Sequence, residues 1–97
     1  MNIEWSPLSL QRINEISEYI AQDNIDAAII WIKSIINAVE KLNNFPEIGR
    51  KVPEIDRSNI REILLKNYRI IYRLGKNKIS ILTVRHGKQI LPDSDLE

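Results

Sequence analysis

Apolar positions at helical spacing run through the first half of the chain. Leu10, Ile13 and Ile20 follow Ser6-Pro7, a pair typical of a helix cap with proline in the first turn. A second helix is predicted over about residues 26–44, after the break at Asp23-Asn24. Its apolar stripe consists of Ala28, Ile32, Ile35, Val39 and Leu42. The pattern predicts an antiparallel helical hairpin over about residues 7–44.

Two residues of the second predicted helix lie away from its apolar stripe. At 3.6 residues per turn, Ile30 points roughly opposite the stripe and Trp31 lies on its flank. A single exposed apolar residue is ordinary on a protein surface. The alternative is that Ile30 and Trp31 form a patch that contacts a partner protein, and the sequence leaves both interpretations open.

From Ile60 onward the apolar period changes to two. Strands are predicted over residues 60–65, 68–74 and 78–84, and the turns between them are short enough to make consecutive strands antiparallel neighbours. Residues 2–5 are expected to form a brief first strand and residues 51–59 a loop. The prediction is a single α+β domain over residues 1–97 with the order β-α-α-β-β-β. The helical hairpin covers one face of a small antiparallel sheet at about residues 60–84.

Composition narrows the kinds of function that are open to the chain. Its 97 residues fit one domain, and 43% hydrophobic with 28% charged residues is typical of a globular protein. With no cysteine, one histidine and three glycines, we expect neither a metal site nor a cofactor bound by a glycine-rich loop. No signal peptide and no membrane span of ~18 apolar residues is recognisable, so a soluble, cytoplasmic protein without membrane association is predicted.

Charge is distributed unevenly along the chain. Residues 1–49 carry three Lys/Arg and seven Asp/Glu, whereas residues 50–97 carry eleven and six. Between residues 57 and 88, Glu62 is the sole acid among nine basic residues. These nine are Arg57, Arg61, Lys66, Arg69, Arg73, Lys76, Lys78, Arg85 and Lys88. Such a region attracts polyanions or an acidic protein surface. The alternative is a solvated face whose counter-charges come from the acidic half.

Strand alternation predicts where part of this positive charge lies. Arg69 and Arg73 share one face of their strand, while Tyr68 and Tyr72 share the other and belong to the core. Arg61 heads the alternate face of the preceding strand. Because Glu62 points to the opposite face from Arg61, an ion pair between these neighbours is disfavoured. A one-sided positive platform of Arg61, Arg69 and Arg73 is therefore predicted.

His86 is the only histidine and ends the last predicted strand. Imidazole transfers protons near neutral pH, and Arg61 or Arg85 would stabilise negative charge that develops on a phosphate. Such a set would cleave RNA by activating a 2′-hydroxyl without a metal. The alternative is a strand-end histidine that makes a structural hydrogen bond.

An ordered set of short segments resembles a known family over about residues 3–91. The segments include Trp5-Ser-Pro7, Phe45-Pro-Glu-Ile-Gly-Arg50, Val52-Pro-Glu54, Ile60-Arg-Glu-Ile63, Tyr68-Arg-Ile-Ile-Tyr-Arg73 and Val84-Arg-His-Gly87. Together they resemble the RelE/ParE superfamily of toxins from type II toxin–antitoxin systems. The resemblance implies the predicted fold and a toxin wrapped by an extended, often helical and acidic segment of its cognate antitoxin. It also implies that operator DNA is bound only through the antitoxin.

The superfamily contains two activities, and the resemblance implies a different site for each. ParE-like members poison DNA gyrase, and the ending Val84-Arg-His-Gly-Lys88 resembles them, which favours gyrase as the target. RelE-like members are endoribonucleases that cut messenger RNA on the ribosome. In that alternative, Glu47, Arg61 and His86 correspond to the catalytic set of the YoeB-like branch, and Arg85 is a further phosphate ligand.

Binding to the antitoxin or to the target would use a separate set of side chains, some apolar and most basic. This predicted binding set consists of Ile30, Trp31, Arg57, Arg61, Arg69, Arg73, Arg85 and Lys88.

Overall fold

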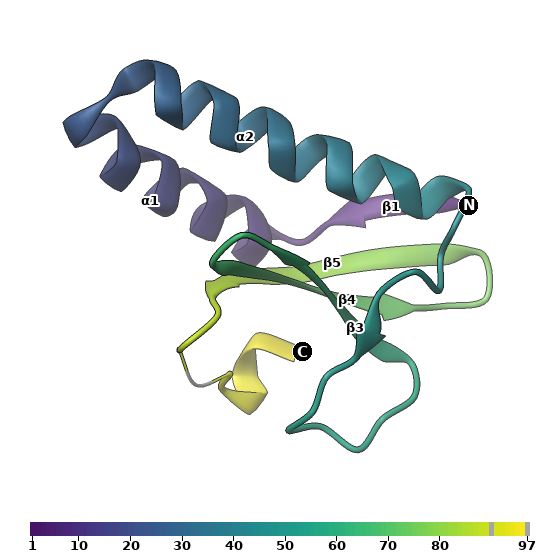
Figure 1. Ribbon diagram of the computed structural model, residues 1–97. Coiled ribbons are helices and arrows are strands. Elements are labelled where there is room, and N and C mark those ends of the chain that lie inside the picture. The colour runs from purple at the N-terminus through teal and green to yellow at the C-terminus, as the bar shows by residue number, and fades with distance from the viewer. Residues whose placement is uncertain (90, 97) are drawn as a thin grey trace.

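The computed structural model describes residues 1–89 and 91–96 (Figure 1). The helices are α1 (Pro7–Asp23) and α2 (Ile25–Glu40), with short 3₁₀ helices at Lys41–Asn43 and Asp93–Leu96. The strands are β1 (Asn2–Trp5), β2 (Arg50–Lys51), β3 (Ile60–Leu65), β4 (Tyr68–Leu74) and β5 (Lys78–His86). The predicted α+β fold with an N-terminal helical hairpin is confirmed.

Side-chain caps fix where both helices begin. Ser6 Oγ accepts a hydrogen bond from the Ser9 N–H at 3.0 Å, and Pro7 occupies the first helical position. Asn24 ends α1 and also caps α2, because its Oδ1 accepts a hydrogen bond from the Ala27 N–H at 3.0 Å. The hairpin link is therefore this one residue. Within the described residues, neither helix has the length and apolar character to cross a membrane.

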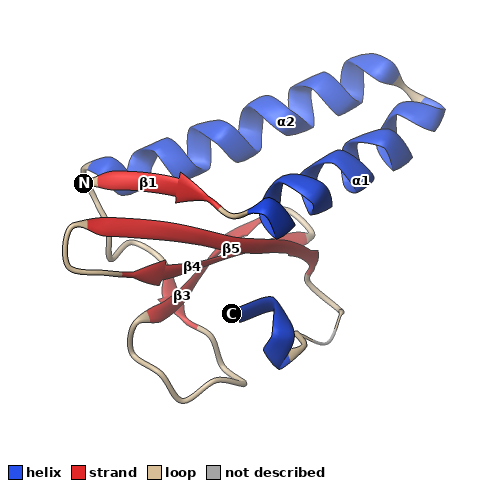
Figure 2. Ribbon diagram, turned by 180° about the vertical axis from the view of Figure 1, so that it is seen from behind, coloured by secondary structure: helices blue, strands red, loops and turns tan. Residues whose placement is uncertain are grey.

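The strands form one sheet in the order β1-β5-β4-β3-β2. Antiparallel pairing of β3, β4 and β5 confirms the predicted hairpins. Two details differ from the prediction. β1 pairs parallel to β5, so the sheet is mixed (Figure 2). β2 pairs with β3 at the start of the segment 51–59 that was predicted to be a loop. Both pairings join segments that no tight turn connects, so local alternation could not reveal them.

The main core lies between the helical hairpin and one face of the sheet (Figures 1 and 2). The buried side of α2 consists of Ala28, Trp31, Ile35 and Val39. Trp31 is 6% exposed and meets the Tyr68 ring edge to face at a centroid distance of 5.3 Å. The predicted surface patch of Ile30 and Trp31 is therefore wrong for Trp31, whereas Ile30 is 62% exposed. Ala28, Ile35, Val39 and Leu42 of the predicted stripe are buried, and apolar residues flank it so widely that the period did not show that Trp31 is buried too.

The opposite face of the sheet carries a second, smaller core. The C-terminal 3₁₀ helix and the chain between β2 and β3 lie over this face (Figure 1). The buried residues of this cluster are Val52, Ile60, Ile71, Leu82, Leu91 and Leu96. We call this the far face of the sheet, because it faces away from the helices. Much of the surface predicted to be a basic platform is thus covered by the chain itself.

Candidate functional site

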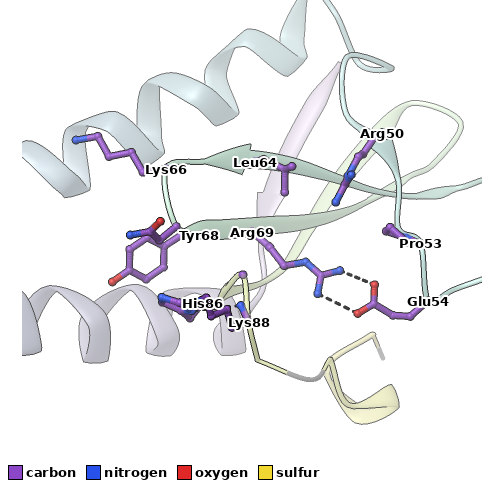
Figure 3. A pocket seen from close by; sticks show the side chains of 11 residues that line it. Arg50, Pro53, Glu54, Leu64, Lys66, Tyr68, Arg69, His86 and Lys88 are labelled. Atoms are coloured by element: carbon purple, nitrogen blue, oxygen red, sulfur yellow. Dashed lines mark hydrogen bonds and ion pairs between the residues drawn. The ribbon is translucent and has the colours of Figure 1, made fainter.

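Arg69 is enclosed in an ion-pair network on the far face. Its Nε donates to Glu62 Oε1 at 2.6 Å. Its two terminal nitrogens donate to the Glu54 carboxylate at 2.9 and 2.7 Å (Figure 3). Arg50 Nε donates to the other oxygen of Glu62 at 2.7 Å. The side chains of Arg69 and Glu62 are 7% and 0% exposed. Arg69 is therefore satisfied by carboxylates of its own chain.

These hydrogen bonds also favour the charged forms of the partners. Hydrogen bonding by Arg69 holds the pKa of Glu54 below its ordinary value, although desolvation acts in the opposite direction. The pKa of Arg69 is raised, chiefly by its hydrogen bonds to Glu54. The pair of Arg69 and Glu54 therefore remains ionised at neutral pH and ties the segment after β2 to the sheet.

Two other arginines fasten the C-terminal 3₁₀ helix to the far face. Arg85 Nη1 donates to Asp95 Oδ2 at 2.6 Å, and Arg73 Nη1 donates to the Leu96 carbonyl at 3.4 Å. Asp95 is 5% exposed, so its charge is compensated by Arg85 in a largely dry setting. Arg73 and Arg85 thus hold chain segments in place instead of presenting a free cationic surface.

Arg61 lies on the helix side of the sheet, away from Arg69 and Arg73. The hairpin register pairs it with Tyr72, and its Nη1 donates to the Gly49 carbonyl at 3.0 Å. The Tyr72 hydroxyl accepts from the Gly49 N–H and donates to the Pro46 carbonyl, both at 2.9 Å. Burial raises the pKa of Tyr72. The predicted platform of Arg61, Arg69 and Arg73 does not form, because the register of the hairpin separates Arg61 from the other two.

His86 lies at the other end of the sheet from Arg61. It pairs with Tyr68, four residues from Tyr72 along β4. At about 3.3 Å per residue, the cross-strand rows of His86 and Arg61 are ~13 Å apart. The His86 and Tyr68 rings meet edge to face with centroids 5.6 Å apart, and His86 Nδ1 accepts from the Lys88 N–H at 3.2 Å. His86 therefore has the structural hydrogen bond that the sequence offered as its alternative role.

The remaining members of the proposed catalytic set are also dispersed. Glu47 is exposed and borders a hollow with Phe45 and Leu74, at the end of β4 remote from Tyr68. Arg85 is on the far face, where it binds Asp95. The structure does not bring Glu47, Arg61, Arg85 and His86 together around one position that a phosphate could occupy.

A cationic hollow of about 460 Å³ remains open beside His86 (Figure 3). Its lining has four Lys/Arg side chains and one carboxylate, Glu54. The basic residues are Arg50, Lys66, Arg69 and Lys88. Arg69 binds Glu54, and Arg50 binds the buried Glu62, so Lys66 and Lys88 supply the remaining positive charge. Leu64, which is 51% exposed, adds an apolar wall. The cationic hollow can accept a carboxylate or phosphate next to an apolar group.

Of the predicted binding set, Ile30, Arg57 and Lys88 are exposed. Arg57 borders a hollow that also contains Asp56 and Asp93, so its surroundings are acidic as well as basic. Sequence reasoning did not single out Arg50, Leu64 or Lys66 for this surface. Lys66 carried a local signal in the sequence, because Lys66-Asn67 is a two-residue link between two predicted strands. The structure places Lys66 in that turn with a φ of 54°.

The chain is similar to known proteins along most of its length. The family model described as "ParE toxin of type II toxin-antitoxin system, parDE" matches residues 3–91. A protein of Sinorhizobium fredii named "Putative toxin Y4kP" is 38% identical over 92 residues, which span 93% of this chain and 92% of that protein. A structure titled "Chromosomal ParDE TA system from P. aeruginosa" superposes with a TM-score of 0.73. It is 18% identical, and the match covers 89% of this chain and 95% of that one, so the fold is shared.

Proposed function

The chain belongs to the ParE toxin family of type II toxin–antitoxin systems, and we propose that it inhibits DNA gyrase in the cytoplasm until a cognate antitoxin neutralises it. The observation that favours gyrase over messenger RNA is the separation of His86 from Arg61. A metal-free nuclease needs its proton donor and its phosphate ligands within hydrogen-bond reach of one phosphate. Here Arg61 and Arg85 bind acceptors of their own chain, which supports action by binding rather than by cleavage.

The target is tested by comparing two reactions with the purified protein. We expect loss of gyrase supercoiling activity and intact message in a cell-free translation extract. His86→Ala should inhibit gyrase as strongly as the unmodified protein, because His86 is remote from Arg61 and makes a structural hydrogen bond. Cleaved message with normal supercoiling would refute the gyrase proposal. If the unmodified protein cleaves message and the His86→Ala variant does not, the proposal is also refuted, because His86 is then needed for cleavage.

The antitoxin is expected to insert an acidic, partly apolar segment into the cationic hollow. Lys66 and Lys88 supply positive charge beside the paired Arg50 and Arg69, and the exposed Leu64 provides an apolar contact. Outside the hollow, Arg61, Arg73 and Arg85 bind acceptors within the chain, so the hollow with Lys66 and Lys88 is the better seat for carboxylates. The surface proposed to bind the antitoxin is therefore one end of the far face, whereas the sequence predicted a broad basic surface.

Charge reversal at the hollow tests the antitoxin proposal. Lys66→Glu and Lys88→Glu should each weaken antitoxin binding roughly tenfold, because attraction becomes repulsion at an exposed site. The matched control is Lys76→Glu, an exposed residue in the turn between β4 and β5. Titration calorimetry at two salt concentrations would measure the antitoxin affinities. High salt should narrow the difference in affinity between these variants and the unmodified protein. Equal affinities for all three variants would place the acidic segment elsewhere.

A further inference from the structure

Four isoleucines of α2 form a second apolar stripe along the edge of the main core, which we call the isoleucine seam (Ile25, Ile29, Ile32 and Ile36). Ile25, Ile29 and Ile36 are 68%, 44% and 41% exposed, and Ile32 is half-buried between them. The seam runs for roughly 16 Å along the helix. Its spacing of four, three and four residues is the repeat by which two helices pack along each other. The outer side of α2 therefore has the pattern of a helix-packing surface.

A hollow of about 340 Å³ adjoins the C-terminal half of the seam. Its walls come from the start of the chain and from α2, and they are apolar throughout: Trp5, Leu10, Ile13, Ile32, Ile35 and Ile36. Leu10 is 54% exposed at its rim. An aliphatic side chain from outside would fit this hollow and lose its contact with water there. The seam therefore combines protruding isoleucine side chains with a hollow that a partner's side chain can fill.

We propose that the isoleucine seam is a self-association surface, on which two copies of this chain pack their α2 helices antiparallel about a two-fold axis. The four-three-four spacing is the same when read in either direction, so a two-fold axis superposes the seam on itself. In that register Ile25 faces the partner's Ile36, and Ile29 faces the partner's Ile32. Ile25, the most exposed of the four, then enters the hollow that Ile36 borders in the other copy.

Charges beside the seam match this arrangement. Asp26 follows Ile25 and Lys33 follows Ile32, so both lie on the same flank of the seam, and both are exposed. The antiparallel register sets Asp26 beside the partner's Lys33, and the two-fold axis repeats that pair. A parallel arrangement would set these charges against the partner's other flank, where Ala28 and Ile35 are buried in its own core and carry no charge. This complementarity favours a second copy as the occupant of the seam.

Sedimentation over a wide range of concentration tests the proposal directly. The unmodified chain should show a monomer–dimer equilibrium, and Ile29→Glu should weaken it at least tenfold, because a carboxylate would be buried against the partner's Ile32. The matched control is Ile30→Glu, which introduces the same charge at a 62% exposed position on the other side of α2. Circular dichroism would confirm that each variant folds. A monomer at every concentration, or dissociation by Ile30→Glu, would overturn the proposal and leave the seam to a partner of another sequence.

A charge exchange distinguishes the antiparallel register from nonspecific association. Asp26→Lys and Lys33→Asp should each weaken the dimer roughly fivefold, because each sets like charges against one another. The double variant restores opposite charges and should return to within about twofold of the unmodified chain. A double variant as weak as either single variant would refute this register. Because the readout is molecular mass, the result is independent of whether gyrase is the target.

Discussion

Arg69→Met is expected to lower the free energy of unfolding by about 3–5 kcal/mol, because it leaves a buried carboxylate without its partner. Glu62 is 0% exposed and receives hydrogen bonds from Arg69 and Arg50, of which only the second would remain. Glu54 would also lose both hydrogen bonds that hold the segment after β2. A loss of this size is a large part of the stability of a small domain. Urea unfolding would measure it.

The control for this prediction is Lys76→Met, at an exposed turn, which should change stability by less than about 0.5 kcal/mol. The double variant Arg69→Met with Glu62→Leu should recover part of the loss, because neither buried charge then remains. Equal stability of Arg69→Met and the unmodified protein would mean that the network contributes nothing to folding.

Arg69→Met should also change how the free energy of unfolding depends on pH. Arg69 lowers the pKa of Glu54 in the folded state, so this pair stabilises the fold above the ordinary glutamate pKa of about 4.3. That contribution is lost as pH falls through the lower, folded pKa. Because Glu54 is 44% exposed, solvent screens part of the effect. Unfolding curves of Arg69→Met should therefore show a weaker decline on acidification than those of the unmodified protein.

Trp31→Ala is expected to cost a further large amount of stability, about 3–5 kcal/mol, because it opens a cavity in the main core. Trp31 is 6% exposed and contacts Tyr68, which in turn contacts His86. The adjacent Ile30→Ala is the matched comparison and should change stability by less than about 0.5 kcal/mol, since Ile30 is 62% exposed. Guanidinium unfolding of both variants would test the assignment. Similar losses at the two positions would contradict the burial of Trp31.

The helices and strands were predictable because their signals are local. Ser6-Pro7 and Asn24 begin the two helices with their own side chains, and alternation from Ile60 onward marks three strands. The ordered segments from Trp5 to Gly87 also resembled the toxin family that the comparisons then identified. None of these inferences required knowledge of which distant parts of the chain are in contact.

The candidate site was harder to predict, because its charges are neutralised over long distances in the sequence. Arg69 meets Glu54, 15 residues away, and Arg85 meets Asp95, 10 residues away, and neither acid belongs to a periodic segment. The side of the sheet on which Arg61 lies depends on the hairpin register that pairs it with Tyr72. A shift of one residue in that register would place Arg61 on the opposite face of the sheet.

By itself, the sequence determined the order of helices and strands, the helical hairpin over one face of the sheet, and membership of the toxin family, because caps, periods and ordered segments are properties of neighbouring residues. Only the tertiary structure decided which basic residues remain open to a partner. Arg61, Arg69, Arg73 and Arg85 are held by acceptors within the chain, and the cationic hollow beside Lys66 and Lys88 stays accessible. The physical reason is that an arginine binds the nearest suitable oxygen, and folding alone determines which oxygen that is.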